Sequence, residues 1–474
     1  MIKLPYDQSS KESILNYALQ LVDKSLREVI DVSDLDQNSL NKGRFGQILE
    51  EYYFYKKLDS NSQPDFPEAG LELKSGAVKK LIRKGELRAK ERLVLSIIDY
   101  NDLVKQNFKT SSFYMKNAQM LLVFHLHKKN TNVLDYIVKL VGVWAFPAED
   151  LRVIEHDWQL IKSKVENGEA HTLSEGDTFY LGACTKGANA SSTRSQPNSN
   201  IPAKQRAFSL KPGYVNHILA KLSGVTDGSF GKLVTAPDLE LAEYDIERIA
   251  LDKFKPYYGK TPENIADMLD VDYNPKAKQR FAMLTKEILG VSSKQEIEEF
   301  SKADITIKTV RISDKNLPRE SLSFPAFKYE EIVKEDSWEL SEFNGLLEKR
   351  FLFVFFKITD KGLLLDKVLF WNMPYVDRQE AKTVWLRTRR LIKDGNVVEK
   401  LEPSDIRRTY FPKKSENRVA HIRPHATNTQ DVYPLPVPDK LTKVTSYTKH
   451  SFWLNDTYVR DSIYNYNAKN LIPI

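Results

Sequence analysis

The sequence predicts a mixed α/β fold arranged as two tandem domains. Short apolar runs of strand length alternate with segments of helical periodicity, which is typical of a central sheet flanked by helices. A chain of 474 residues is too long for one ordinary hydrophobic core. The second half also repeats the order of motifs found in the first. We therefore expect a first domain over residues 1–225, a linker over 226–240 and a second domain over 241–474.

The N-terminal region predicts two helices. Apolar residues recur at helical spacing over residues 9–29, and Ser10 is a suitable N-cap. A second helix is expected to start near Lys42, with Phe45 on its apolar face. Glu50 lies beside that face, where an isolated glutamate usually meets solvent.

The stretch PDFPEAGLELKSG, residues 64–76, is the first candidate site. Leu71 and Leu73 alternate with Glu72 and Lys74, and alternation at period two predicts a strand. Side chains at i and i+2 of a strand project from the same face, so Glu72 and Lys74 should point together. Asp65, on the approach to that strand, could reach the same place. Two carboxylates and a lysine can hold a hard divalent cation and position a water for attack on phosphorus. The same residues could also form a surface salt bridge.

The rest of the first half completes the expected sheet. The polar loop NFKTSSFYMKN, residues 107–117, contains Lys116. Apolar runs predict strands at 91–100, 119–125 and 134–145, and an amphipathic segment predicts a helix at 147–168.

Residues 183–206 contain few large apolar groups and carry Lys186, Arg194, Lys204 and Arg206. One interpretation is a surface loop. The other is a loop that enters a DNA groove, with amide and guanidinium groups facing base edges and lysines facing phosphates. The following segment, 207–222, should be ordered, and SGVTDGSFGK at 223–232 is the best linker candidate.

Five pairs of motifs relate the two halves, four of them at offsets of 234–244 residues and the SSF pair at 210, and their shared order predicts duplication of a whole domain. The pairs are RFGQILEE at 44–51 with RFAMLTKE at 280–287, GLELKSG at 70–76 with DITIKTV at 304–310, SSF at 111–113 with SLSF at 321–324, TKGAN at 185–189 with PHATN at 424–428, and AFSLKPGY at 207–214 with SFWLNDTY at 451–458.

The candidate site changes between the two copies. Glu50 becomes Lys286, Asp65 becomes Glu299 and Glu72 becomes Thr306, whereas Lys74 persists as Lys308. A site that has lost carboxylates and gained a positive charge should not hold a divalent cation. We expect the second domain to keep the fold without the chemistry.

Composition and the distribution of apolar residues limit the kinds of protein this chain can be. The formal net charge of +7 fits an anionic partner without identifying one. The single cysteine, Cys184, excludes an internal disulfide and a cysteine-ligated zinc site. The N-terminus lacks the apolar core of a signal peptide, and no apolar run reaches membrane-spanning length. The expectation is a cytoplasmic protein without a membrane partner.

Five segments, taken in order, resemble the MutH and Sau-type GATC endonucleases. They are KGRFGQILE, PDFPEAGLELKSG, TSSFYMK, TKGANA and RAFSLKPGY. Over essentially the whole chain the sequence is similar to the Sau-type enzymes, in which two MutH-like, restriction-endonuclease-like domains lie in one chain and only the first is catalytic. The resemblance implies a type II restriction endonuclease that uses Mg²⁺ to cut double-stranded DNA at GATC. The expected cut lies before the G and leaves a 5′ overhang.

The resemblance also implies residue roles. Asp65, Glu72 and Glu50 would ligate Mg²⁺, Lys74 would orient or activate the attacking water, and Lys116 would stabilise charge on the phosphate. The residues expected to contact DNA lie in both halves: Lys186, Gly187, Asn189, Arg194 and Ser209 in the first, and Arg423, His425 and Asn428 in the second.

Ser209 departs from part of the family. The strand-discriminating repair enzymes carry a tyrosine at this place, which is linked to sensing the adenine methyl group. A serine removes that bulk, so we predict that the chain tolerates adenine methylation of GATC.

Cutting both strands of a palindrome needs two active sites, so we expect two chains to dimerise on DNA. The second domain would bind another GATC copy as an effector or brace the complex. Two alternatives stay open: a MutH-like GATC nickase of mismatch repair, and a non-catalytic DNA-binding protein.

Overall fold

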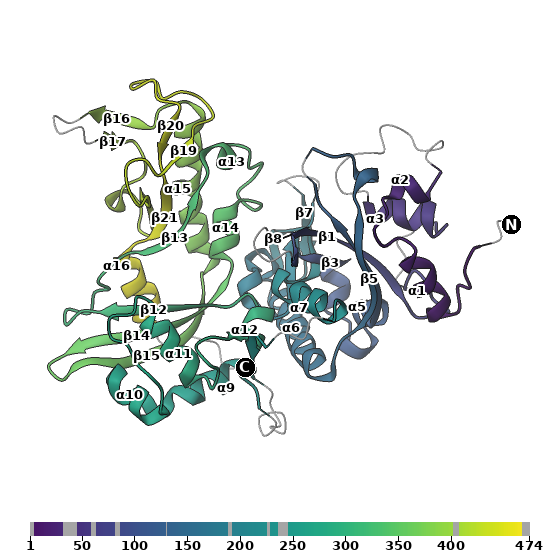
Figure 1. Ribbon diagram of the computed structural model, residues 1–474, viewed down its shortest axis with the longest axis horizontal. Coiled ribbons are helices and arrows are strands. Elements are labelled where there is room, and N and C mark those ends of the chain that lie inside the picture. Colours follow the sequence, from purple (N-terminus) through teal and green to yellow (C-terminus); the bar gives the residue numbers. More distant parts are fainter. Residues whose placement is uncertain are drawn as a thin grey trace. The chain divides into compact units, whose positions relative to one another are not determined.

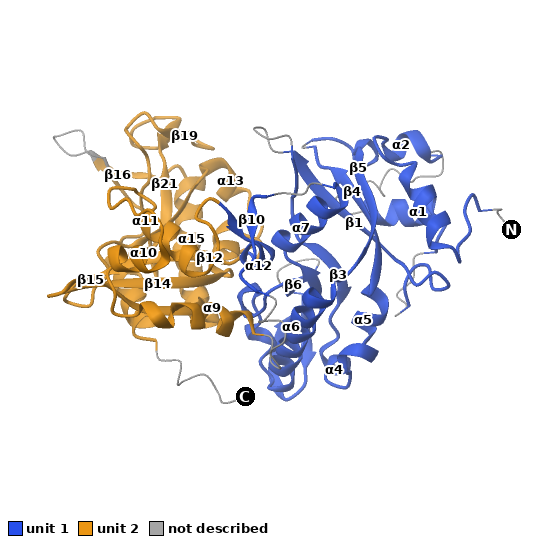
Figure 2. Ribbon diagram, turned by 60° about the horizontal axis from the view of Figure 1, so that its bottom comes forward, with its two compact units in different colours: residues 1–244, 295–304 blue, residues 245–294, 305–474 orange. Residues whose placement is uncertain are grey.

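The computed structural model describes residues 4–31, 45–57, 63–80, 86–128, 130–187, 192–224, 228–235, 245–401 and 407–466 (Figure 1). The chain divides into two compact units, shown in different colours in Figure 2. The first unit contains residues 1–244 and 295–304, and the second contains 245–294 and 305–474. The expected domains were continuous in sequence, whereas the segment 295–304 groups with the first unit.

The first unit is built on a mixed four-stranded sheet of order β2-β1-β4-β5 (Figure 2). Its strands are β1 (Glu72–Lys80), β2 (Leu87–Ala89), β4 (Gln119–Leu126) and β5 (Val138–Ala145). β1 runs parallel to β4, and the other two pairs are antiparallel. β4 is buried from Met120 to His125, as expected for a central strand covered on both faces.

A second, three-stranded antiparallel sheet has the order β3-β9-β6. The smaller strands of this unit pair as a hairpin, β7 with β8, and as a short parallel pair, β10 with β11. The bounds are β3 (Leu93–Ile97), β6 (Leu181–Thr185), β7 (Thr193–Gln196), β8 (Ser199–Lys204), β9 (Arg206–Leu210), β10 (Phe230–Gly231) and β11 (Glu296–Ile297).

Helices cover these sheets and lead into the strands. They are α1 (Lys11–Leu19), α2 (Leu26–Val29), α3 (Phe45–Ile48), α4 (Tyr100–Leu103), α5 (Ser112–Asn117), α6 (Ala148–Glu166), α7 (Pro212–Leu222), α12 (Glu298–Lys302), the π-helix η2 (Leu49–Tyr53) and the 3₁₀ turns η3 (Phe108–Thr110), η4 (Val133–Asp135), η5 (Ala170–Thr172) and η6 (Glu175–Asp177). Buried Asp157 of α6 accepts the N–H groups of Phe179, Tyr180 and Leu181, and so fixes the start of β6 against the long helix.

The second unit repeats this plan. One sheet has the order β12-β14-β15 and the other β13-β21-β18 (Figure 1). Its strands are β12 (Thr306–Ile312), β13 (Leu322–Phe327), β14 (Arg350–Thr359), β15 (Gly362–Asn372), β16 (Val398–Leu401), β17 (Arg407–Thr409), β18 (Ala420–Pro424), β19 (Val432–Pro434), β20 (Ser446–Thr448) and β21 (His450–Leu454). Its helices are α9 (Ile246–Phe254), η7 (Lys255–Tyr257), α10 (Pro262–Leu269), α11 (Arg280–Ile288), α13 (Tyr329–Val333), α14 (Glu342–Leu347), α15 (Tyr375–Lys393), η8 (Lys414–Glu416), α16 (Asp456–Tyr458) and η9 (Val459–Tyr464).

Equivalent contacts recur in the two units. β12 pairs parallel with β14, and β14 pairs antiparallel with β15, as β1, β4 and β5 do. A 19-residue helix follows each sheet, α6 in the first unit and α15 in the second. The Tyr214 hydroxyl donates to Asp150 at 2.9 Å, and the Tyr458 hydroxyl donates to Asp377 at 2.7 Å. The two halves therefore share both their strand topology and a buried Tyr–Asp contact.

Several sequence expectations need correction. The helix expected over 9–29 ends at Leu19, because residues 20–25 turn before α2 begins. The loop expected at 107–117 contains η3 and α5, so Lys116 lies on a helix. The polar stretch 183–206 contains the β7–β8 hairpin. Part of the expected linker forms β10.

The pairing of SSF at 111–113 with SLSF at 321–324 is also wrong. Ser111 caps α5 by accepting the Tyr114 N–H, and Ser341 caps α14 by accepting the Asn344 N–H. Each of these helices leads into the middle strand of its sheet, so Ser341 is the structural counterpart of Ser111. Residues 322–327 form β13, which corresponds to β3.

Candidate active site

Asp65, Glu72 and Lys74 meet at the start of β1. The Lys74 ammonium donates to Glu72 Oε1 at 2.5 Å, and the Asp65 N–H donates to Glu72 Oε2 at 3.1 Å. Asp65 Oδ2 in turn accepts the Leu73 N–H at 2.8 Å. The expectation that the three side chains converge is confirmed by these contacts.

A tight turn brings Asp65 back to the strand. Phe66 and Leu71 exchange backbone hydrogen bonds of 2.9 and 3.2 Å. Gly70 closes this turn with a φ of +62°, a conformation that glycine adopts without steric cost. Phe66 is fully buried and anchors the loop. The sequence PDFPEAGLEL thus encodes both the turn and the strand that carry the site.

Glu50 reaches the same site from the π-helix η2. The pKa of Glu50 is raised to about 7 by burial and by the charges of Asp65 and Glu72, against the opposing effect of Lys74. Single-turn π-helices are frequent at functional sites because the extra residue re-aims a side chain. Tyr17 of α1 stacks on Tyr53 of η2 with ring centroids 4.5 Å apart, which holds this turn in place.

Lys116 approaches from the last turn of α5, just before β4. Its ammonium lies 3.6 Å from Glu72 Oε1. The Ser111 cap fixes the first turn of the helix, and the buried Asn117 amide donates to the Phe113 carbonyl at 2.8 Å. Four separate elements therefore contribute to one cluster.

Glu72 is the buried centre of this cluster, with an exposed fraction of 1 %. Burial raises its pKa to about 7; Lys74 opposes that shift and Asp65 adds to it. Strongly perturbed carboxyls with named charge partners are typical of catalytic sites.

The donor set suits a hard cation by its chemistry, because all three carboxyls offer oxygen ligands. Within the described ranges, however, no group of three Asp, Glu, His or Cys side chains is arranged to hold a metal ion. The oxygens of Glu72 are engaged by Lys74 and by the Asp65 N–H. Burial, together with repulsion between the carboxyls, raises the pKa of Glu50 and Glu72, and a divalent cation would offset both effects, so the residues fit such an ion electrostatically.

The structure also shows one neighbour that the sequence did not suggest. The Lys56 ammonium lies 4.6 Å from the Phe66 ring centroid and donates to Gln8 at 2.7 Å. Burial lowers its pKa, against the effect of Asp65. Only the turn at Phe66 brings these residues together, so no sequence spacing could have indicated it.

The expected DNA-contacting residues of the first unit are only partly exposed. Lys186 and Gly187 are exposed just after β6, and Arg194 is exposed on β7. Asn189 lies outside the described residues. Arg206, in contrast, is buried and donates to the Ala183 and Leu173 carbonyls, which makes it a structural residue.

Ser209 requires a correction. It lies in β9, paired with Val94 of β3 on one side and with Gly182 of β6 on the other. Its exposed fraction is 1 %, which argues against the direct DNA contact that was expected.

In the second unit, Arg423, His425 and Asn428 are exposed at and after the end of β18. The Arg423 guanidinium lies 5.0 Å from the Trp453 ring centroid, and His425 Nδ1 lies 2.8 Å from Ser451 Oγ. The Asn428 side chain accepts the N–H groups of Gln430 and Asp431, so it also shapes the loop.

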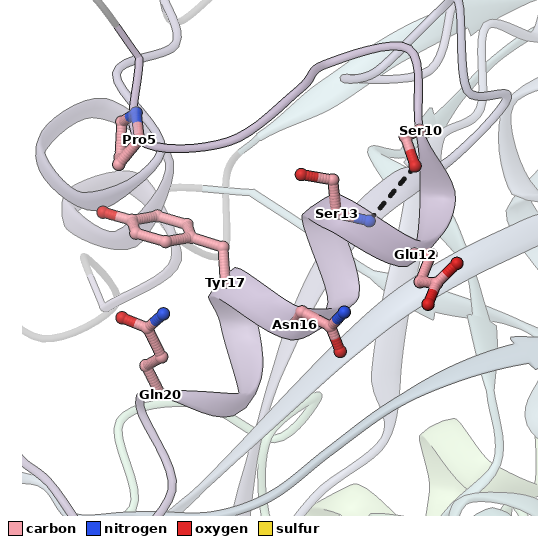
Figure 3. Close-up of a pocket in the computed structure, with 7 residues that line it drawn as sticks. All are labelled: Pro5, Ser10, Glu12, Ser13, Asn16, Tyr17 and Gln20. Carbon is pink, nitrogen blue, oxygen red and sulfur yellow. Dashed lines mark hydrogen bonds between the residues drawn. The ribbon is translucent and has the colours of Figure 1, made fainter.

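A cavity of about 350 Å³ lies over α1, lined by side chains that include Ser10, Glu12 and Tyr17 (Figure 3). None of the cluster residues lines it. The catalytic candidates thus lie outside this cavity, around the start of β1.

Across the described residues, no helix is both long and apolar enough to cross a membrane.

Two comparisons with known proteins match this chain to MutH. A family profile described as "DNA mismatch repair enzyme MutH" matches residues 54–157, which include Asp65, Glu72, Lys74 and Lys116. The chain is 27 % identical over 169 residues to the "DNA mismatch repair protein MutH" of Buchnera aphidicola subsp. Baizongia pistaciae, covering 35 % of this chain and 74 % of that protein.

A second relative matches almost end to end. The chain is 37 % identical over 489 residues to the "Type II restriction enzyme Sau3AI" of Staphylococcus aureus, covering 96 % of this chain and 98 % of that protein. The predicted resemblance is therefore confirmed. The chain belongs to the family of the type II restriction enzyme Sau3AI, with a MutH-like domain in its first half.

Proposed function

We propose that this protein is a type II restriction endonuclease that recognises GATC in double-stranded DNA and hydrolyses it with Mg²⁺. The cluster of Glu72, Lys74, Lys116 and Asp65 carries the proposal, because it places two ammonium groups beside a buried carboxylate at the start of β1. The biological role would be defence against foreign DNA in the cytoplasm, as part of a restriction-modification system.

Each residue of the cluster would have a separate role in the reaction. Asp65, Glu72 and Glu50 would hold the cation through oxygen ligands. When bound, Mg²⁺ supplies a more acidic water and neutralises charge on the leaving oxygen. Lys74, bonded to Glu72, is placed to orient the attacking water, and Lys116 is placed to stabilise the additional negative charge on the phosphate.

The second unit would bind DNA without cutting it. It would have arisen by duplication of the first, a proposal supported by the shared strand topology and the repeated Tyr–Asp contact. With one catalytic cluster in each chain, two chains would meet on the palindrome. Arg423, His425 and Asn428 would face DNA in the second unit, and Lys186, Gly187, Asn189 and Arg194 in the first.

The test is cleavage of plasmids of known methylation state, followed by sequencing of the ends. We expect discrete fragments with ends before the G of GATC, produced only when Mg²⁺ is present. Lys74→Ala should abolish cleavage, whereas Lys79→Ala, on the exposed end of the same strand, should not. Single-strand nicks alone would favour the mismatch-repair nickase, and DNA binding without any cleavage would favour a non-catalytic protein.

A further inference from the structure

The second unit carries lysines at the place where the first unit carries its catalytic cluster. Strand register fixes the correspondence. Thr306 opens β12 opposite Phe351, as Glu72 opens β1 opposite Met120. Lys308, two residues further along, therefore occupies the position of Lys74.

A second lysine accompanies Lys308. Lys349 lies between α14 and β14, just before the strand, whereas Lys116 lies on the last turn of α5, the helix that precedes β4 in the first unit. Burial lowers the pKa of Lys308, and the charge of Lys349 lowers it further. The two ammonium groups are thus close enough to repel each other.

The carboxylates of the first site have no working equivalent here. Thr306 stands in place of Glu72, and Lys286 of α11 stands in place of Glu50. The counterpart of Asp65 is Glu299, which is 6 % exposed and accepts the N–H groups of Leu233 and Val234 at 2.9 and 3.0 Å.

The charge balance of the two sites is therefore opposite. Three carboxylates and two ammonium groups interact in the first unit. At Lys308, burial and the charge of Lys349 together disfavour the charged form and lower the pKa. Neighbouring, partly buried ammonium groups are unfavourable, and an anion that hydrogen-bonds to both would stabilise them.

We propose that Lys308 and Lys349 form a site for a phosphodiester of double-stranded DNA that needs no divalent cation. The ligand class rests on the proposed function, because DNA is the anion that such an enzyme meets. The first unit must recruit a cation before a phosphate can approach its carboxylates. The second unit supplies the positive charge from its own side chains.

This difference has a measurable consequence. In EDTA, the carboxylates of the first unit repel the phosphate, whereas the lysines of the second still attract it. Binding of DNA that persists without metal should therefore depend on the second unit. Each lysine that contacts a phosphate adds about 1 to the slope of log affinity against log salt concentration.

The test uses the full chain, EDTA and a short duplex that contains one GATC. We expect Lys308→Met with Lys349→Met to weaken metal-free binding by at least about tenfold and to lower the salt slope by about 1–2. Lys308→Arg should keep the binding, because it keeps the charge. Lys361→Met is the matched control, since it removes an exposed lysine beyond the opposite end of β14. Inorganic phosphate should compete for the wild-type site.

Metal-free affinity and salt slope that equal those of the wild type would overturn the proposal, provided that circular dichroism shows a folded double variant. An equal loss of metal-free binding in the Lys361→Met control would overturn the proposal as well. The loss would then reflect the overall charge of the protein rather than a site at Lys308 and Lys349. The proposed nuclease function is judged separately, by Mg²⁺-dependent cleavage of plasmid by the wild-type chain. The two assays therefore separate the two proposals: cleavage at GATC tests the nuclease function, and metal-free binding tests the phosphate site.

Discussion

Proton release on metal binding is the most direct prediction from the active-site cluster. The pKa values of Glu50 and Glu72 are both raised to about 7 in the folded protein without metal. A cation requires both carboxyls in their charged form, so binding must displace any protons that they hold. Metal affinity should therefore rise with pH through about 7.

The magnitude follows from the two pKa values. A carboxyl with a pKa of about 7 is about nine-tenths protonated at pH 6 and about one-tenth protonated at pH 8. Binding should release about 1.8 protons at pH 6 and about 0.2 at pH 8. For the buried Glu72, a shift from 4.5 to about 7 corresponds to about 3 kcal/mol of preference for the neutral form.

Calorimetry with Mn²⁺, in pairs of buffers with different ionisation enthalpies, measures this release directly. Glu50→Gln should lower the release at pH 6 by about one proton, whereas Glu51→Gln, an exposed neighbour on the same π-helix, should leave it unaltered. Finding no proton release at pH 6 in the wild type would refute the reasoning, because both carboxyls would then be ionised before the metal arrives.

The same shift links stability to pH. Since folding raises the pKa of Glu72, its contribution favours the folded state fully below its ordinary value and is lost as the pH rises through about 7. The metal-free chain should consequently lose stability at this site between about pH 4.5 and about pH 7. Glu72→Gln should reduce that loss, and Mg²⁺ should raise the melting temperature more at pH 8 than at pH 6.

Three further predictions concern the first unit. Lys302→Met should lower the free energy of unfolding by about 3–5 kcal/mol, measured by urea denaturation, because it leaves buried Asp150 without the ammonium now 3.0 Å away. Gly213→Ala should cost about 1–3 kcal/mol, since the new Cβ would lie 1.9 Å from the Ser301 carbonyl oxygen; Gly345→Ala, which meets nothing within 4 Å, is its neutral control. Plasmid with adenine-methylated GATC should be cut as fast as unmethylated plasmid, and selective protection by the methyl group would contradict the prediction drawn from Ser209.

The local part of the site could be predicted from sequence. Alternation in GLELK fixes which face of β1 carries Glu72 and Lys74, and the hydrogen bond between them follows from that spacing. Asp65 was within reach for the same reason, since Gly70 permits a tight turn between it and the strand.

The contributions of residues far apart in sequence could not be predicted. The raised pKa of Glu50 depends on a π-helical turn, and helical periodicity does not distinguish a π-turn from an α-turn. Lys116 was expected in a loop, because NFKTSSFYMKN is polar; the Ser111 cap and the buried Phe113 make its end helical. The burial of Ser209 depends on strands far apart in sequence, and no motif records it.

The two units also differ in how they neutralise the same buried carboxylate. Asp377 accepts from Tyr458 and is paired with Arg418, 41 residues further along the same unit. Asp150 accepts from Tyr214, but its cation is Lys302.

Lys302 belongs to a segment that follows most of the expected linker and several helices of the second unit in sequence. Removing one partner of a buried ion pair leaves an uncompensated charge, so a chain that ends at residue 225 would lack a group that its own core requires. The segment 295–304 is therefore held in the first unit by charge as well as by packing. Its carboxylate Glu299, at the position of Asp65, is bonded to the backbone of Leu233 and Val234 rather than placed for chemistry. One short stretch of sequence thus holds both the carboxylate that aligns with Asp65 and the ammonium that pairs with Asp150.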